Sequence, residues 1–324
     1  MKILSLFDWM ACWYEALVRA WIKIDKYYAS EIDKYAIQIA LKNHPDIIEI
    51  WDVCNVKWED YQDIDLLIWG SPCQWFSMAW KMLNFNDPRS KLFFEFLRLK
   101  EEIKPKYFLL ENVKMKKEFQ DVISSYMWVE PIEIDSALVS AQRRKRLYWT
   151  NIPWITQPED KWILLKDILE HDVDEKYNIS EKHTTAMKNA RSSWELNLPD
   201  KDGKCGTIIA SYYKIPQDWP YILKDKQVSV PSATQIGQSK NWGNSYWSNK
   251  AYTLRDSNPN WVIESVQPPR IRKLTPIECE RLQTMPDNYT EWVSDTQRYK
   301  MLWNWWTVDV IAHIFSFMES HSQE

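Results

Sequence analysis

Glycine is scarce in this chain of 324 residues: it occurs five times, whereas tryptophan occurs 21 times. A typical glycine content of about 7% would give roughly 23 glycines in a chain of this length. The two counts together, 26, come close to that number. The composition therefore suggests that many tryptophans stand where glycine is usual.

Other scarcities exclude whole classes of protein. Five cysteines, an odd number without a CxxC pair, argue against a disulfide framework and against a structural zinc site. No run of 18 apolar residues occurs, and the apolar run at the N-terminus is too short for a signal peptide and is interrupted by Asp8. A formal net charge of -4 gives no basic bias, so a nucleic-acid partner would have to meet a local patch. We expect a soluble intracellular protein without a metal site.

Short apolar runs alternate with amphipathic stretches over the first 150 residues, which predicts a parallel sheet covered by helices on both faces. Strands are expected at 3–7, 24–31, 47–50, 64–68 and 107–110, and helices at 14–20, 33–44 and 89–103. The expected fold class is therefore α/β.

The pattern changes beyond residue 155, where Pro, Asn, Ser and Asp become frequent up to about residue 268. It recovers near residue 272 with a helix for which Thr275 is the N-cap, Pro276 the first helical residue and Glu278 the capping-box partner. A closing amphipathic helix is expected over 308–318. We predict a first domain over 1–154, a smaller loop-rich domain over 155–268, and a return to the first domain over 269–324.

Three reactive groups follow or open expected strands of one sheet. Cys73 lies in the sequence Gly-Ser-Pro-Cys-Gln directly after the strand at 64–68, and Glu111 directly follows the strand at 107–110. A basic cluster at 142–146 opens the next apolar run. Each feature alone has an ordinary explanation, such as an inert thiol or a solvated charge. Because ligands bind at the carboxyl ends of strands in open α/β sheets, their coincidence favours a catalytic site.

Eight segments, in this order, resemble the motifs of the DNA (cytosine-5) methyltransferase family. They are LSLFD at 4–8, SE at 30–31, DV at 52–53, GSPCQ at 70–74, ENV at 111–113, QRRKR at 142–146, RKLTPIECERLQ at 272–283 and the segment 304–308. The resemblance covers nearly the whole chain except the variable region at 155–268. It is nearest to bacterial and phage relatives of the animal de novo subgroup.

The resemblance implies a Rossmann-like methyltransferase fold with a smaller target-recognition domain, and it implies a mechanism. The cysteine that matches Cys73 attacks C6 of a cytosine rotated out of double-stranded DNA, and C5 then takes a methyl group from S-adenosylmethionine. Glu111 would bind the N3 and N4 edge of the base. Arg144 and Arg146, from the pattern QxRxR, would complete the pocket, with Arg146 at O2.

The same resemblance implies a set of cofactor-binding residues. Glu31 lies 24 residues after Phe7, close to the offset of about 20 residues at which an acidic side chain meets ribose hydroxyls in related folds. The residues that the resemblance assigns to S-adenosylmethionine are Phe7, Asp8, Glu31, Ile32, Asp52, Val53, Pro72, Leu92, Asn304 and Trp306.

The sequence departs from the family where the family has glycine. Its first motif, Phe-x-Gly-x-x-x-Gly, has Trp9 and Trp13 at the two glycine positions. The same replacement is found at Trp51, Trp69, Trp75, Trp303 and Trp305, whereas Trp149 and Trp306 stand where relatives also have tryptophan. Because tryptophan tolerates neither positive φ nor a close cofactor, we expect the chain as written to fold poorly or to be inactive.

Three functions remain open at the level of sequence. The first is methylation of cytosine C5 in double-stranded DNA by a cytoplasmic monomer of a bacterial or phage-infected cell. The second is the same chemistry on transfer RNA. The third is a non-catalytic nucleic-acid-binding protein in which tryptophans block the cofactor cleft.

Overall fold

The computed structural model describes residues 1–70, 88–178, 203–205, 222–223, 252–254, 261–263, 271–303 and 305–318. The chain divides into two compact units. The larger comprises Met1–His171, Pro199–Trp219 and Thr275–Glu324, and the smaller comprises Asp172–Leu198 and Pro220–Leu274. The three-part division expected from composition stays a prediction.

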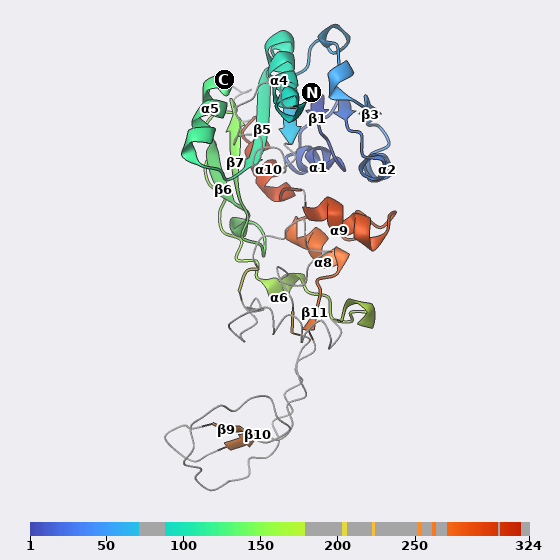
Figure 1. The fold of residues 1–324 in the computed structure, drawn as a ribbon, viewed down its shortest axis with the longest axis vertical. Coiled ribbons are helices and arrows are strands. Elements are labelled where there is room, and N and C mark those ends of the chain that lie inside the picture. The colour runs from blue at the N-terminus through green and yellow to red at the C-terminus, as the bar shows by residue number, and fades with distance from the viewer. Residues whose placement is uncertain are drawn as a thin grey trace. The chain divides into compact units, whose positions relative to one another are not determined.

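A mixed sheet of seven strands forms the centre of the larger unit (Figure 1). In spatial order the strands are β3 (Ile48–Glu49), β2 (Lys26–Ser30), β1 (Lys2–Leu6), β4 (Leu66–Gly70), β5 (Tyr107–Val113), β7 (Lys145–Thr150) and β6 (Ile132–Asp135). The first five strands are parallel, as predicted. β7 runs antiparallel to both β5 and β6, so the sheet is mixed at one edge. The predicted α/β class is confirmed.

The described part of this unit also contains eight α-helices. They are α1 (Cys12–Arg19), α2 (Lys34–Asn43), α4 (Pro88–Ile103), α5 (Lys117–Met127), α6 (Leu165–Ile168), α8 (Pro276–Leu282), α9 (Asp295–Trp303) and α10 (Val308–Phe315). The C-terminal helix α10 packs against α1, the helix that follows β1 in the chain.

Local sequence explains where two of these helices begin. Asp33 caps α2 by accepting hydrogen bonds from the backbone N–H groups of Tyr35 and Ala36. The predicted capping box of α8 is confirmed: Thr275 accepts from the N–H of Glu278, and the Glu278 carboxylate accepts from the N–H of Thr275.

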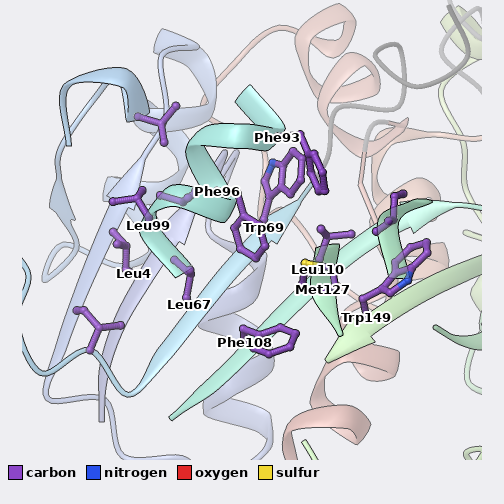
Figure 2. Packing of buried hydrophobic residues seen from close by; sticks show 14 of the residues in the cluster. Leu4, Leu67, Trp69, Phe93, Phe96, Leu99, Phe108, Leu110, Met127 and Trp149 are labelled. Atoms are coloured by element: carbon purple, nitrogen blue, oxygen red, sulfur yellow. The ribbon is translucent and has the colours of Figure 1, made fainter. Parts of the chain in front are cut away.

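One hydrophobic cluster lies between the sheet and helices α4 and α5 (Figure 2). Trp69 of β4 is 2% exposed and stacks on Phe93 and Phe96 of α4, with ring centroids 5.4 and 5.2 Å away. Leu67 and Leu110, from β4 and β5, belong to the same cluster. The tryptophan at position 69 is therefore accommodated as part of the core.

The smaller unit contains two described strand pairs, both antiparallel. β8 (Ile222–Leu223) pairs with β11 (Ile271–Arg272), and β9 (Tyr252–Leu254) pairs with β10 (Trp261–Ile263). Within the described residues of either unit, no helix combines the length and the apolar character needed to cross a bilayer.

Candidate active site

The strand register brings the predicted site segments to one edge of the sheet. Leu6 at the end of β1 pairs with Ser30 at the end of β2, and Gly70 at the end of β4 pairs with Glu111 of β5. The carboxyl ends of these strands therefore lie at one edge of the sheet, where ligands bind in open α/β folds. Cys73, Pro72 and Asn304 lie outside the described residues.

Glu111 forms an ion pair with Arg146 at this edge. The Nε atom of Arg146 lies 3.1 Å from Oε1 of Glu111, and the two side chains are 11% and 4% exposed. Burial raises the pKa of Glu111 to about 7, although the charges of Arg146 and Arg144 act to lower it. A carboxyl group with this pKa exchanges a proton readily near neutral pH.

The strand that holds Glu111 is longer than predicted. β5 continues to Val113 because its last residues pair with β7, where Tyr148 stands opposite Glu111. Glu111 is thus inside the strand, and the prediction that it follows the strand end was wrong. The Tyr148 hydroxyl is buried without a hydrogen-bond partner among the described residues. Burial and the negative charge of Glu111 raise the pKa of Tyr148.

Arg144 occupies a different place from Arg146. Its side chain is buried, and its Nη2 donates to the carbonyl oxygen of Trp303, 3.1 Å away, at the end of α9. Its backbone N–H donates to the carboxylate of Asp135 at the end of β6. Arg144 therefore ties the segment before β7 to α9, whereas Arg146 lies beside Glu111.

The buried side chain of Gln283, to which the sequence assigned no role of its own within the motif at 272–283, connects the same elements. The Nε2 of Gln283 donates to the carbonyl oxygen of Leu302 at 2.9 Å, and the backbone N–H of Val308 donates to the carbonyl oxygen of Gln283 at 3.0 Å. Its Oε1 lies 3.4 Å from the Nε2 of Gln142 and 3.3 Å from the hydroxyl of Thr307. The sequence did not predict these contacts, because the partners of Gln283 lie far from it along the chain. The local sequence shows only a glutamine at the end of an amphipathic helix.

At the carboxyl ends of β1 and β2, the Glu31 carboxylate organises the turn after β1. One oxygen accepts from the N–H groups of Ile32 and Asp33 at 2.7 and 2.8 Å, and the other accepts from the N–H of Trp9 at 3.0 Å. The indole N–H of Trp9 donates to the carbonyl oxygen of Met301 in α9, 3.1 Å away. Trp9 thus bridges Glu31 and α9. Burial raises the pKa of Glu31, and its backbone hydrogen bonds oppose this shift.

The remaining predicted cofactor residues differ in exposure. Ile32 is 74% exposed beside Glu31, and Asp52 is exposed as the N-cap of the short 3-10 helix at Val53–Asn55. Val53 itself is buried. Leu92 of α4 is half-buried against the hydrophobic cluster.

Phe7 and Asp8, both predicted to bind cofactor, lie in the turn after β1. Phe7 adopts φ 57° and its ring lies 6.1 Å from that of Trp69. Asp8 is fully buried, and its carboxyl group accepts a hydrogen bond from the hydroxyl of Tyr27 in β2. Burial raises the pKa of Asp8 to about 7. The Asp8 side chain therefore faces the interior and holds the turn to the neighbouring strand.

Three tryptophans pack together beside the end of β4. The ring of Trp306 lies 3.8 Å from that of Trp305 and 4.1 Å from that of Trp13, and all three side chains are at most 2% exposed. The indole of Trp306 occupies the space that a side chain at Gly70 would need. Glycine at position 70 is therefore required by this close approach. The indole N–H groups of Trp13 and Trp306 are buried without an acceptor among the described residues.

A model of the C-5 cytosine-specific DNA methylase family matches residues 1–124 and 139–320. The chain belongs to this family. The match includes β1 to β5, β7 and the C-terminal helices, and therefore every element that carries a candidate site residue. The chain is thus a cytosine-5 methyltransferase by family, and the predicted resemblance is confirmed.

Curated relatives agree with this methylase assignment, and a solved structure shares the fold. The chain is 31% identical over 313 residues to the type II methyltransferase M1.ScrFI of Lactococcus lactis, covering 87% of this chain and 69% of that protein. It is 25% identical to the orphan methyltransferase M.SPRI of Bacillus phage SPR, covering 97% and 96%. The fold is similar to that of the Entamoeba histolytica methyltransferase EhMeth, with a TM-score of 0.70, 18% identity and coverage of 98% and 97%.

Proposed function

We propose that this methylase transfers a methyl group to C5 of a cytosine rotated out of double-stranded DNA, and that Cys73 is the nucleophile. The observation that carries the proposal is the buried pair of Glu111 and Arg146, one strand away from Gly70, which leads directly into the Cys73 segment. A DNA substrate is supported by the family match and by the type II methyltransferase relatives.

Cytosine C5 is a weak nucleophile, and the chain supplies what activates it. The Cys73 thiolate forms a bond to C6, and the electron pair of the C5–C6 double bond moves into the ring toward N3 and O2. Glu111, whose pKa is about 7, gives a proton to N3, and the guanidinium of Arg146 binds the O2 side. C5, now enamine-like, takes up an electrophile, which is a proton from water when no methyl donor is bound. Loss of the hydrogen that C5 originally carried then restores the C5–C6 double bond and expels the Cys73 thiolate, and N3 returns its proton to Glu111.

S-adenosylmethionine would supply the methyl group when bound, and the chain fits one half of this molecule. The exposed apolar side chain of Ile32, next to Glu31 in the chain, and the exposed carboxylate of Asp52 after β3 suit an adenine ring and ribose hydroxyls. The other half does not fit. The indole of Trp9 spans from the turn after β1 to α9, and the buried indole of Trp13, which follows that turn in the chain, packs against that of Trp305 with ring centroids 6.3 Å apart. We therefore derive no step through the cofactor.

The cysteine half of the site is testable without cofactor. Once sulfur has added to C6, C5 takes a proton from water, and removal of a hydrogen from C5 regenerates cytosine. Duplex DNA labelled with tritium at cytosine C5 should therefore release tritium to water. We expect release with the chain, none with Cys73→Ala, and at least about a hundredfold less with Glu111→Gln.

Matched controls separate this chemistry from general damage. Cys54 is exposed and Glu118 lies on the surface of α5, so Cys54→Ala and Glu118→Gln should release tritium at the original rate. Release that persists in Cys73→Ala would contradict the proposal. Release from labelled transfer RNA but not from duplex DNA would assign the same chemistry to the other substrate, and nucleic-acid binding without release from either would favour a non-catalytic protein.

A further inference from the structure

Tryptophan is the commonest residue at the described backbone positions that favour glycine. Twelve non-glycine residues among those described have a positive φ, and six of them are tryptophans. These six are Trp9, Trp21, Trp51, Trp128, Trp154 and Trp162, with φ between 55° and 62°. A left-handed backbone is strained for a bulky side chain and is adopted routinely only by glycine.

Trp21 stands at the most diagnostic of these positions. The N–H of Trp21 donates to the carbonyl oxygen of Val18, and the N–H of Ile22 donates to that of Leu17, both at 3.0 Å. These two bonds define a Schellman motif at the end of α1. The residue that occupies the left-handed position of this motif is usually glycine, because a Cβ atom is unfavourable there.

Trp128 and Trp154 also stand at positions where glycine is usual, one at a helix end and one in a turn. Trp128 is the left-handed cap of α5, with φ 61° and its N–H bonded to the carbonyl oxygen of Ser124 at 2.8 Å. Trp154 follows Pro153 in a turn, and Pro-Gly is the usual pair at the centre of a type II turn. Helix caps and turns are unrelated structures, yet tryptophan stands at the glycine position of each.

The six indoles gain little from packing that would offset this strain. Trp21 is 90% exposed, Trp128 85%, Trp154 77% and Trp162 76%, and Trp51 is also largely exposed. Trp9 is partly buried, but its indole lies in the turn where the family motif has glycine. Tryptophans that pack well are found at ordinary backbone positions, such as Trp149, whose buried indole donates to Ser124 at 3.0 Å.

We propose that the cell that makes this protein inserts glycine at these six positions. One residue type replaced by one other, at sites that share a backbone conformation and little else, indicates a single event acting on one codon. The codon UGA would explain such a replacement. UGA is read as tryptophan in some bacterial codes, and it differs from the glycine codon GGA in its first base only. Independent mutations would have produced a mixture of residues at these sites.

The inference does not depend on the proposed function, because Trp21, Trp128, Trp154 and Trp162 lie outside the candidate active site. It does bear on that site at Trp9. Glycine there would remove the indole that bridges the turn after β1 and α9, and would leave the Glu31 carboxylate beside an open turn. The part of the mismatch with the cofactor that Trp9 causes would then be absent from the protein made in the cell.

The decisive experiment is peptide mass spectrometry on the protein purified from the cell that carries its gene, together with the codons of that gene. We expect glycine residue masses at the six left-handed positions and UGA as their codon. The matched controls are Trp149 and Trp306, at which we expect tryptophan masses and UGG. Tryptophan masses at the six positions, or UGG codons there, would overturn the proposal.

Discussion

Arg146 lies with its Nε atom 3.1 Å from Oε1 of Glu111, in a pair that burial almost removes from water. The pKa of Glu111 is nevertheless raised to about 7, because desolvation exceeds the attraction of the neighbouring guanidinium groups. Glu111 is thus held where it can donate a proton at neutral pH and can also lose one. The guanidinium of Arg146 keeps the pKa of Glu111 from rising further.

This relationship predicts how Arg146→Ala changes the pH dependence of tritium release. If protonated Glu111 is required, release by the original chain declines above about pH 7. Removal of Arg146 takes away a cation that lowers the pKa of Glu111, so the decline should move to higher pH, and the rate should fall by about a hundredfold or more. The exposed Arg143 is the matched control, and Arg143→Ala should leave the decline where it was. An unmoved decline in Arg146→Ala would refute this role for the pair.

Stability should fall as pH rises from about 4 to 7. The pKa of Asp8 is raised from its ordinary value of 3.8 to about 7, so in this window the folded chain holds a proton that the unfolded chain has lost. Each pH unit in the window then costs up to about 1.4 kcal/mol of unfolding free energy from this group. Glu49 and Glu111, also raised to about 7, act in the same direction.

Urea unfolding at a series of pH values measures this effect. Asp8→Asn should flatten the slope between pH 4 and 7, since the asparagine cannot ionise. Asp25→Asn is the control, because it removes an exposed carboxylate, and it should leave the slope between pH 4 and 7 unchanged. Equal slopes in the original chain and in Asp8→Asn would show that the Asp8 carboxyl group is not desolvated as described.

Glycine at the left-handed positions should stabilise the chain. A bulky residue in this conformation costs roughly 1 to 2 kcal/mol, so Trp21→Gly and Trp128→Gly should each raise Tm by about 2 to 4 °C or more. Trp292 is also exposed but has no positive φ, so Trp292→Gly should give no increase. Thermal unfolding of the three variants decides the point, and equal changes in Tm in all three would mean that backbone conformation is not the cause.

Gln283 should be essential to the packing of the C-terminal helices. It is fully buried and bonds to the end of α9, to Thr307 and to Gln142, so Gln283→Leu leaves several buried polar groups without a partner. We expect a loss of about 2 to 3 kcal/mol of unfolding free energy. Exposed Gln38 of α2 makes one hydrogen bond to a backbone carbonyl, and Gln38→Leu should change stability by less than about 0.5 kcal/mol. Chemical denaturation of both variants tests this contrast.

Much of the fold follows from local sequence. Apolar runs predicted β1 to β5 to within a few residues, and the sequence around Thr275 predicted a capping box that the structure contains. The four-residue strand β6 and the polar helix α9 were missed, since both have weak periodicity and depend on packing against distant segments. The extension of β5 through Glu111 was missed for a related reason, because its partner β7 begins more than thirty residues later.

Predictability of the site differs from residue to residue. The order of the motifs along the chain predicted that Glu111 and Arg146 belong to one site, and the structure brings the two side chains into contact. The burial of Asp8 and the separate role of Arg144 depend on packing that sequence alone does not contain. The glycine in the family motif indicates a left-handed backbone at Trp9. Pro153 before Trp154 likewise indicates a turn with a left-handed residue, which composition alone does not reveal.

The most direct test of the central claim is to identify the atom that attacks the base. The chain with glycine at the six left-handed positions and at Trp13 and Trp305 is incubated with S-adenosylmethionine and duplex DNA that contains 5-fluorocytosine. Fluorine cannot leave C5 as a proton does, so the covalent complex accumulates and its peptide can be mapped by mass spectrometry. We predict a single adduct on Cys73. An adduct on another cysteine, or cytosine methylation that persists in the Cys73→Ser variant of the same chain, would contradict the proposed mechanism.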